Sequence, residues 1–417
     1  MTAPLEGVLV ADFSRVLAGP LATMNLADLG ATVVKVERPG AGDDTRSWGP
    51  PWTEHSSSYF ESVNRSKRSV TLDLRAQGDL ALARELARRA DVFIENFRPG
   101  ALDRYGLGYE QVRATNPGIV YASITGFGRE EGAGLMGYDF LVQAVGGLMS
   151  VTGAPDGEPT KAGVALVDVL TGKDATIGIL AALAARERSG EGCRVEVELL
   201  SSLLSAMVNQ GQGYLQTGRA PGRMGNRHPS IAPYETLHCK GGLLAVACGN
   251  DGQFARFAET LGAPELAADE RFATNAARVG HREELVEALE SRLAEADAET
   301  WQERLTGADV PAGRVGDLAD GFALAERLGL EPWSEATQRD GVASAEDVSG
   351  DGGRGVPQVR HPVRYGTELT TTPSAPPRLG EDDAEVRSWL AEPDPAPLPA
   401  APTRQTEDKE PTRKALR

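Results

Sequence analysis

The sequence is poor in the residues that build disulfide frameworks and metal centres. Its 417 residues include three cysteines and five histidines. Cys193, Cys239 and Cys248 are odd in number and form no C-x-x-C pair, so we expect no disulfide framework and a cytoplasmic location, where thiols stay reduced. The histidines, scattered from His55 to His361, show no metal-ligand spacing, and no bound metal is expected.

Long apolar runs and an excess of positive charge are also lacking. The longest nearly apolar run, residues 175–185, is too short to span a bilayer, and no basic segment followed by an apolar stretch indicates a secretory signal. A formal net charge of −17 argues against nucleic acid or an anionic membrane as partner, because such a surface repels both. Small anionic ligands are not excluded, since they respond to local charge.

What is present is a chain of globular composition, 41% hydrophobic and 25% charged, whose length suits two domains. Its first 125 residues alternate short β-like runs with helical patterns, which predicts an α/β domain with a mostly parallel sheet. Ligands bind to such sheets at the carboxyl ends of the strands. The expected strands are residues 7–12, 32–37, 69–74, 91–95 and 119–125, with helices at 20–29 and 79–89.

Composition changes along the chain predict two domains, two linkers and a tail. Stretches rich in Gly, Pro, Arg or Asp indicate linkers, and a Pro-, Ala- and charge-rich end without periodicity indicates disorder. The expected segments are a large α/β domain at 1–217 completed by about 356–390, a linker at 218–230, a small α+β domain at 231–330, a return linker at 331–355 and a disordered tail at 391–417.

The first β-α-β unit lacks the glycine pattern of a dinucleotide site. The turn after its first strand reads Ser14-Arg-Val-Leu-Ala-Gly-Pro20, without the G-x-G-x-x-G that lets the backbone approach a pyrophosphate. A nicotinamide or flavin enzyme is therefore disfavoured. Basic residues at expected loops and strand ends either bind ligand phosphates or balance acidic neighbours, the commoner case. They are Arg38, Arg46, Arg65, Lys67, Arg68, Arg98 and Arg104.

Asp168 interrupts an apolar run, Val164-Ala-Leu-Val167 and Val169-Leu170. A buried carboxylate must cap a helix, be paired or be functional, because burying it alone is costly. Capping is the commoner alternative, although a helix N-terminus also stabilises an anionic nucleophile. The segment Gly249 to Gln253 lies between an expected strand and an expected helix, and is either an ordinary connection or a loop whose amides contact a ligand.

Short motifs along residues 5–370 add a second line of argument. They are Gly7-Val-Leu-Val-Ala-Asp12 with Ala18-Gly-Pro20, Gly30-Ala-Thr-Val-Val-Lys-Val-Glu-Arg-Pro39, Lys67-Arg-Ser69, Glu95-Asn-Phe-Arg-Pro-Gly100, Gly137-Tyr-Asp-Phe140 and Gly225-Asn-Arg-His-Pro229. Together they resemble the class III CoA-transferase family, which includes formyl-CoA and carnitine-CoA transferases. The resemblance implies a large Rossmann-like parallel-sheet domain and a smaller α+β domain, joined by linkers into an interlocked, ring-shaped homodimer.

The resemblance also implies roles for particular residues. Asp168 falls on the family's nucleophile, which attacks the donor thioester and becomes an aspartyl-CoA thioester by way of a mixed anhydride. The acceptor acid reverses these steps, so the CoA thioester is a co-substrate, and neither a permanently bound cofactor nor a metal is implied. The family's mobile loop over the thioester falls on Gly249, Asn250, Asp251, Gly252 and Gln253, and its CoA contacts fall on Val16, Leu17, Arg38, Leu72, Asn96, Phe97, Arg98 and Arg104.

Two alternatives share this resemblance. The α-methylacyl-CoA racemases need a histidine in a Gly-His-Asp segment, where this sequence has Gly137-Tyr138-Asp139. Tyrosine is a poor general base near neutral pH, so a transferase is favoured. A catalytically silent CoA-binding homologue is the other alternative.

The substrate is predicted from a longer similarity. Residues 137–153, followed by Pro159-Thr-Lys161, resemble family members that use succinyl-CoA with a second dicarboxylate. The expected partners are therefore an acyl-CoA and a small carboxylic acid. Arg15, Arg46 and Arg227 are candidates to pair with a distal carboxylate.

Overall fold

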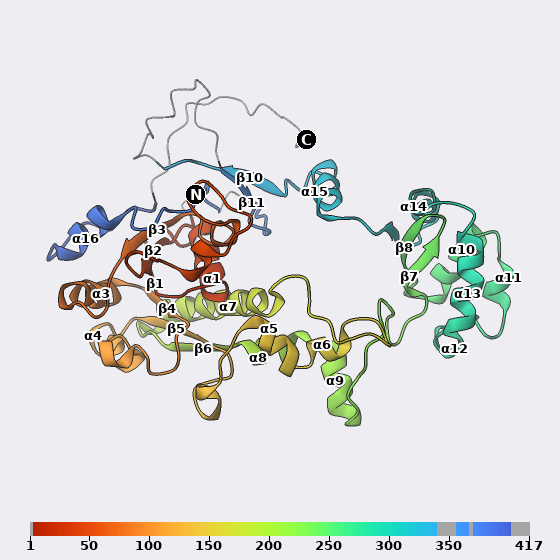
Figure 1. The fold of residues 1–417 in the computed structure, drawn as a ribbon, viewed down its shortest axis with the longest axis horizontal. Coiled ribbons are helices and arrows are strands. Elements are labelled where there is room, and N and C mark those ends of the chain that lie inside the picture. Colours follow the sequence, from red (N-terminus) through yellow and green to blue (C-terminus); the bar gives the residue numbers. More distant parts are fainter. Residues whose placement is uncertain (1–2, 340–355, 367–369, 402–417) are drawn as a thin grey trace, which may run out of the picture. The chain divides into compact units, whose positions relative to one another are not determined.

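The computed structural model describes residues 3–339, 356–366 and 370–401, and the chain forms two compact units (Figure 1). The first unit comprises Met1–Gly146, Gly163–Gly211 and Glu331–Arg417, and the second comprises Gly147–Ala162 and Gln212–Leu330. Residues 147–162, which the sequence analysis placed in the large domain, thus group with the second unit.

A six-stranded sheet forms the centre of the first unit, in the order β3-β2-β1-β4-β5-β6. Every neighbouring pair is parallel, which confirms the predicted α/β sheet. Strand order reverses between β1 and β4, and such a reversal opens a crevice at the carboxyl ends of the strands. The strands are β1 (Leu9–Asp12), β2 (Thr32–Glu37), β3 (Lys67–Thr71), β4 (Val92–Glu95), β5 (Val120–Thr125) and β6 (Arg194–Glu198).

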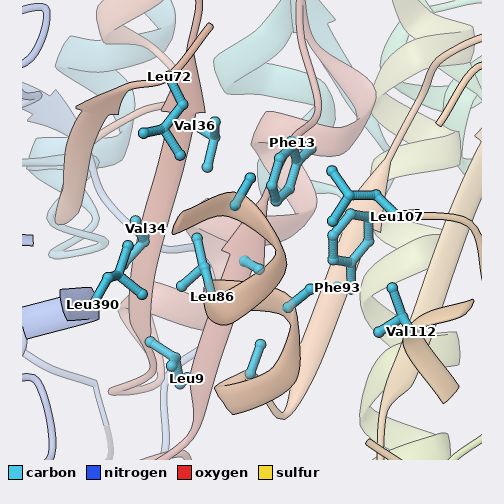
Figure 2. Packing of buried hydrophobic residues seen from close by; sticks show 14 of the residues in the cluster. Leu9, Phe13, Val34, Val36, Leu72, Leu86, Phe93, Leu107, Val112 and Leu390 are labelled. Atoms are coloured by element: carbon cyan, nitrogen blue, oxygen red, sulfur yellow. The ribbon is translucent and has the colours of Figure 1, made fainter. Parts of the chain in front are cut away.

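Helices cover both faces of this sheet. Strand residues such as Leu9, Val34 and Phe93 form one buried cluster with Leu86 of α3 and Leu390 of α16 (Figure 2). On the other face, α1 and α7 pack together and contact the strands. The longer helices are α1 (Ala18–Asp28), α3 (Gln77–Arg89), α4 (Tyr109–Thr115), α5 (Asp139–Val145), α7 (Leu166–Ser189), α8 (Leu199–Ala206) and α16 (Asp383–Ala391). Short pieces are η1 (Asp44–Ser47), α2 (Ser58–Glu61), η2 (Asp103–Tyr105), η3 (Glu131–Gly134) and an antiparallel pair of strands, β10 (Trp333–Ala336) and β11 (Val356–Val359).

The second unit is built on an antiparallel sheet of three strands, β7 (Tyr234–Cys239), β8 (Gly242–Ala247) and β9 (Ala312–Arg314). A core of aromatic and leucine side chains, including Phe254, Phe257 and Trp301, joins the sheet to its helices. The helices are α6 (Leu148–Val151), α10 (Asp251–Thr260), α11 (Glu265–Ala268), α12 (Asn275–Gly280), α13 (Arg282–Leu293), α14 (Ala298–Gly307) and α15 (Leu318–Arg327), while α9 (Val208–Thr217) begins in the first unit and ends in the second.

The first part of the expected tail lies against the first unit. Leu398 joins the core of the sheet, and its carbonyl accepts a hydrogen bond from Thr32 Oγ1 at 3.3 Å. Arg68 donates to the carbonyls of Pro399 and Ala400. Residues 402–417 of the tail, and residues 340–355 of the return linker, lie outside the described residues. In the described ranges no helix has the length and apolar character needed to cross a bilayer.

Candidate active site

A cleft of about 280 Å³ opens in the first unit where β1, β4 and β5 end. The turn after β1, the turn after β4 and the segment after β5 form its walls. It brings together eight candidate site residues of the sequence analysis: Arg15, Val16, Leu17, Asn96, Phe97, Arg98, Tyr138 and Asp168. Residues far apart in the sequence thus meet at the carboxyl edge of the sheet, where an α/β fold places its ligands.

Asp168 lies in the first turn of α7 and is half-buried in the cleft wall. No other described residue forms a hydrogen bond with its carboxylate, whereas its backbone N–H donates to Asp139. The amino end of a helix carries partial positive charge, which favours an anion at this position. Asp168 therefore presents an unengaged carboxylate to the cleft.

Asp139, at the start of α5, caps α7 in place of Asp168. Its Oδ1 accepts the backbone N–H groups of Val167 at 2.7 Å and of Asp168 at 3.2 Å, and its Oδ2 accepts Gln143 Nε2 at 2.7 Å. The N-cap residue of α7, Ala165, has no side chain that can cap. The capping alternative for Asp168 is thus wrong, because a carboxylate from another helix satisfies those N–H groups.

A pair of glycines brings Asp139 to this place. A Cβ atom on Gly126, at the end of β5, would lie 2.4 Å from the Cα of Gly137, a distance that no side chain tolerates. Only glycine at both positions lets the two backbones approach this closely. The Gly137-Tyr-Asp segment therefore docks on the sheet edge with Tyr138, an exposed phenol, lining the cleft and Asp139 against α7.

The surroundings of Asp168 disfavour its negative charge. Burial raises the pKa of its carboxyl, and the negative charge of Asp139 adds to the effect, to about 7. Burial likewise raises the pKa of Tyr59 to about 12, with Asp168, Asp139 and Asp43 adding to it. The Tyr59 phenol consequently stays protonated at neutral pH, and no pattern in the sequence pointed to it.

This raised pKa predicts a stability effect at Asp168. An acid whose folded-state pKa lies above its ordinary value favours folding when protonated, and that contribution is lost as the pH rises from about 4 through 7. Asp168→Asn is therefore expected to raise the free energy of unfolding by ~1–3 kcal/mol at pH 8 and by much less at pH 5. Thermal unfolding at both pH values measures the difference, and equal gains at pH 5 and pH 8 would contradict it.

The side chain of Asn96 links two of the turns that form the cleft wall. Its carboxamide accepts the backbone N–H of Arg15 at 2.9 Å and donates to the carbonyl of Arg15 at 2.7 Å, which joins the turn after β4 to the turn after β1. Phe97, whose N–H is held by Glu95 Oε2 at 2.8 Å, lies under the Arg15 guanidinium at 5.0 Å. The side chain of Asn96 is thus engaged within the protein, and Phe97 supports an arginine in the cleft wall.

Two arginines, Arg15 and Arg98, line the cleft together with the carboxylates of Asp44 and Asp168, and Arg38 lies outside this lining. Arg15 and Arg38 both pair with Asp44, at 3.1 and 3.2 Å, and Arg98 contacts the sulfur of Met136. The guanidinium groups in the cleft wall suit a phosphate or carboxylate ligand on an otherwise acidic protein.

The other basic candidates lie elsewhere. Four are nearly or fully buried in ion pairs and hold the fold: Arg46 with Glu37, Arg65 with Asp28, Lys67 with Asp12 and Arg68 with Asp382. Arg104 stacks on Tyr105, outside the cleft lining, and Arg227 pairs with Glu283 and Glu235 in the second unit. Leu72 lies in the core of the sheet (Figure 2). Of the three candidates for a distal carboxylate, Arg15 is the one that lines the cleft.

Residues Gly249 to Gln253 begin α10 in the second unit. Asn250 Oδ1 accepts the N–H of Gln253 at 2.9 Å, and Gln253 Oε1 accepts the N–H of Gly249 at 2.7 Å. Asp251 pairs with the buried Arg278 at 2.7 Å. The segment is therefore a capped helix start whose first glycine N–H is already engaged, and the part it plays in catalysis stays a prediction.

Comparison with known proteins assigns the family. The family model described as CoA-transferase family III matches residues 5–383. The chain belongs to this family. A relative, the succinate–glutarate CoA-transferase of Agrobacterium fabrum, is 42% identical over 93% of this chain and 96% of its own. The succinyl-CoA:glutarate CoA-transferase of Mus musculus is 45% identical over 78% of this chain and 75% of its own.

A solved structure agrees with the assignment. A CaiB/BaiF family protein from Brucella suis superposes with a TM-score of 0.82 at 42% identity, covering 94% of this chain and all of that one. Membership of family III and these named transferases confirm that the protein is a CoA-transferase, as its sequence motifs predicted.

Proposed function

We propose that this CoA-transferase moves CoA from succinyl-CoA to a dicarboxylic acid, with glutarate the first candidate, through a covalent aspartyl-CoA thioester on Asp168. The observation that carries the proposal is the Asp168 carboxylate, which faces the cleft from the first turn of α7 without a hydrogen-bond partner among the described residues. The two named relatives, both succinate–glutarate transferases, support the substrates.

The chemistry divides into two symmetrical halves. Asp168 attacks the thioester carbonyl, the C–S bond breaks, and a mixed anhydride and CoA thiolate form. The thiolate then attacks the Asp168 acyl carbon, the anhydride C–O bond breaks, and the donor acid leaves as its carboxylate. The acceptor carboxylate attacks the resulting aspartyl-CoA thioester and releases thiolate, which takes the acyl group from the new anhydride and restores Asp168. Every intermediate stays activated, so no further energy source enters.

The cleft supplies position and charge for these steps. The capped first turn of α7 fixes the attacking carboxylate, and Arg15 supplies a cation for the anionic substrate. Leu17 and Ala18 bring the start of α1, which has no side-chain cap, to the same wall, where its N–H groups favour oxyanions. Val16, Arg38, Asn96, Phe97 and Arg98 would bind or shape the CoA portion, and we extend the proposal to Leu72 and Arg104 through backbone or peripheral contacts.

The loop and assembly implied by the family belong to the same proposal. Gly249 to Gln253 would cover the reacting thioester and exclude water, which otherwise hydrolyses an anhydride. An interlocked homodimer is supported by apolar side chains exposed on α5, α7 and α8, three helices of the first unit that contact one another: Leu141, Val145, Ile177 and Leu204. Large exposed apolar patches mark association surfaces. Free thiols support a cytoplasmic location.

An acceptor assay tests the substrates. With succinyl-CoA as donor and a series from oxalate to adipate as acceptors, we expect glutarate to give the highest kcat/KM, at least about tenfold above butyrate, because a second carboxylate gains a charge-assisted contact. No transfer to any dicarboxylate would contradict the proposal. Exchange of an α-proton in deuterated water without transfer would favour a racemase, and neither signal would favour a silent homologue.

Arg15 is expected to set the preference for dicarboxylates. Arg15→Gln should lower kcat/KM for glutarate by about 10²-fold and for butyrate by less than about fivefold, because only glutarate loses an ion pair. Arg227→Gln is the matched comparison. If Arg227→Gln removes the preference and Arg15→Gln does not, the distal carboxylate is bound by the second unit instead.

A further inference from the structure

The turn after β1 contains a valine in a conformation that valine rarely adopts. Val16, which lines the cleft, has a φ of +70°. Its β-branched side chain makes this left-handed region unfavourable, and residues persist there only where their surroundings hold them. The wall of the cleft therefore depends on whatever keeps Val16 in place.

The first three residues of this turn, Ser14, Arg15 and Val16, are each held by residues from outside the turn. The carbonyl of Ser14 accepts Lys35 Nζ at 3.0 Å, and the backbone of Arg15 is held on both sides by Asn96. The N–H of Val16 donates to the Asp43 carboxylate, with 3.2 Å to Oδ2 and 3.3 Å to Oδ1. Lys35 and Asp43 thus hold the first and the third of these residues.

Lys35 and Asp43 form a buried ion pair behind the cleft. Their charged atoms lie 2.9 Å apart and both side chains are fully inaccessible. Asp43 also accepts the N–H and the hydroxyl of Thr45. Burial raises the pKa of Asp43, but Lys35 and these hydrogen bonds outweigh it and lower the pKa to about 2, so the acceptor of the Val16 N–H stays charged at working pH.

We propose that the Lys35–Asp43 pair is a positioning device, which keeps Val16 in its left-handed conformation and thereby shapes the cleft wall for acyl-CoA. Neither residue lines the cleft, so their effect passes through the backbone of the turn. The inference rests on the proposed binding of acyl-CoA at this cleft. A purely structural pair would contribute to folding but leave ligand affinity unchanged.

Glycine at position 16 distinguishes a positioning role of the Lys35–Asp43 pair from a purely structural one, because glycine adopts a positive φ without penalty. The test replaces the pair by apolar residues of similar size in Lys35→Met/Asp43→Leu, which leaves no buried charge unpaired. We expect the Kd for CoA and the KM for succinyl-CoA to rise at least about tenfold, while kcat changes less than about threefold. Adding Val16→Gly to this variant should recover at least about threefold of the loss.

Two further variants serve as controls for this comparison. Arg65→Met/Asp28→Leu removes another buried pair, near the far end of α1, and should leave the Kd for CoA unchanged. Asp43→Asn, which keeps the size of the side chain, replaces the double variant should that variant not fold. Measured with and without Val16→Gly, it should lower the affinity for CoA by about threefold and show the same recovery.

Three results would overturn the inference. They are a wild-type Kd in the apolar variant, additive losses when Val16→Gly is combined with it, and an equal loss in the Arg65/Asp28 control. Calorimetry measures the Kd for CoA, and so tests the effect of the Lys35–Asp43 pair without turnover. Wild-type protein that binds CoA but transfers none would therefore sink the proposed function and leave this test intact.

Discussion

Asp168→Asn is expected to abolish CoA transfer, with kcat lowered at least about 10⁴-fold and the Kd for CoA changed by less than about threefold. The amide has the size of the carboxyl but cannot attack a thioester, and the cap that positions it comes from Asp139, which the substitution leaves in place. Intact-mass measurement after mixing with succinyl-CoA should show a CoA-sized adduct on the wild-type chain and none on the variant.

A matched variant guards against an indirect effect. Asp139→Asn keeps an oxygen that can cap α7 and leaves the nucleophile intact, so its adduct should persist. An adduct on Asp168→Asn would place the nucleophile elsewhere. Loss of the adduct from both variants would mean that the cap, rather than the chemistry of Asp168, had been measured.

The second large effect is expected in the pH dependence. The attacking form of Asp168 is the carboxylate, and its pKa is raised to about 7 by burial and by Asp139. We therefore expect kcat/KM to fall about tenfold for each pH unit below 7 and to level off above it. Tyr59 does not titrate in this range, since its pKa is raised to about 12.

Removing the negative charge of Asp139 should shift the pH range in which kcat/KM falls. In Asp139→Asn the loss of like charge beside Asp168 is expected to lower the midpoint of the pH dependence of kcat/KM by about one pH unit. The CoA phosphate, which titrates near pH 6, affects both proteins alike, so the difference between the two profiles reports Asp168. A midpoint that stays near 7 in the variant would show that Asp139 does not set it.

The arrangement of the first unit was predictable because local sequence patterns indicate its strands and helices. The strands around Val10, Val34 and Phe93 read as short apolar runs between helical periods, and parallel order follows from that alternation. The same pattern predicted ligand binding at the carboxyl ends of the strands, while the family resemblance supplied the particular residues expected there. Asp168 was visible as a charge inside an apolar run.

Partners from other segments were not predictable. The cap of α7 comes from Asp139, whose contact with α7 depends on the close approach of Gly126 and Gly137. For Arg46 and Arg68 the sequence favoured pairing with acidic neighbours over phosphate binding, but it did not identify the buried partners, Glu37 and Asp382. In each case the deciding contact joins residues that only the folded chain brings together, and one sequence contains no signal for such a pairing.

The cap from α5 has a consequence for recombination between relatives. Asp139 and Asp168 lie on different helices, yet one fixes the backbone of the other. A crossover between residues 140 and 165 would unite a nucleophile from one parent with a cap from another, and a parent with a longer or shorter side chain at position 139 would misplace the carboxylate. Chimeric enzymes should therefore inherit residues 137–168 as one block.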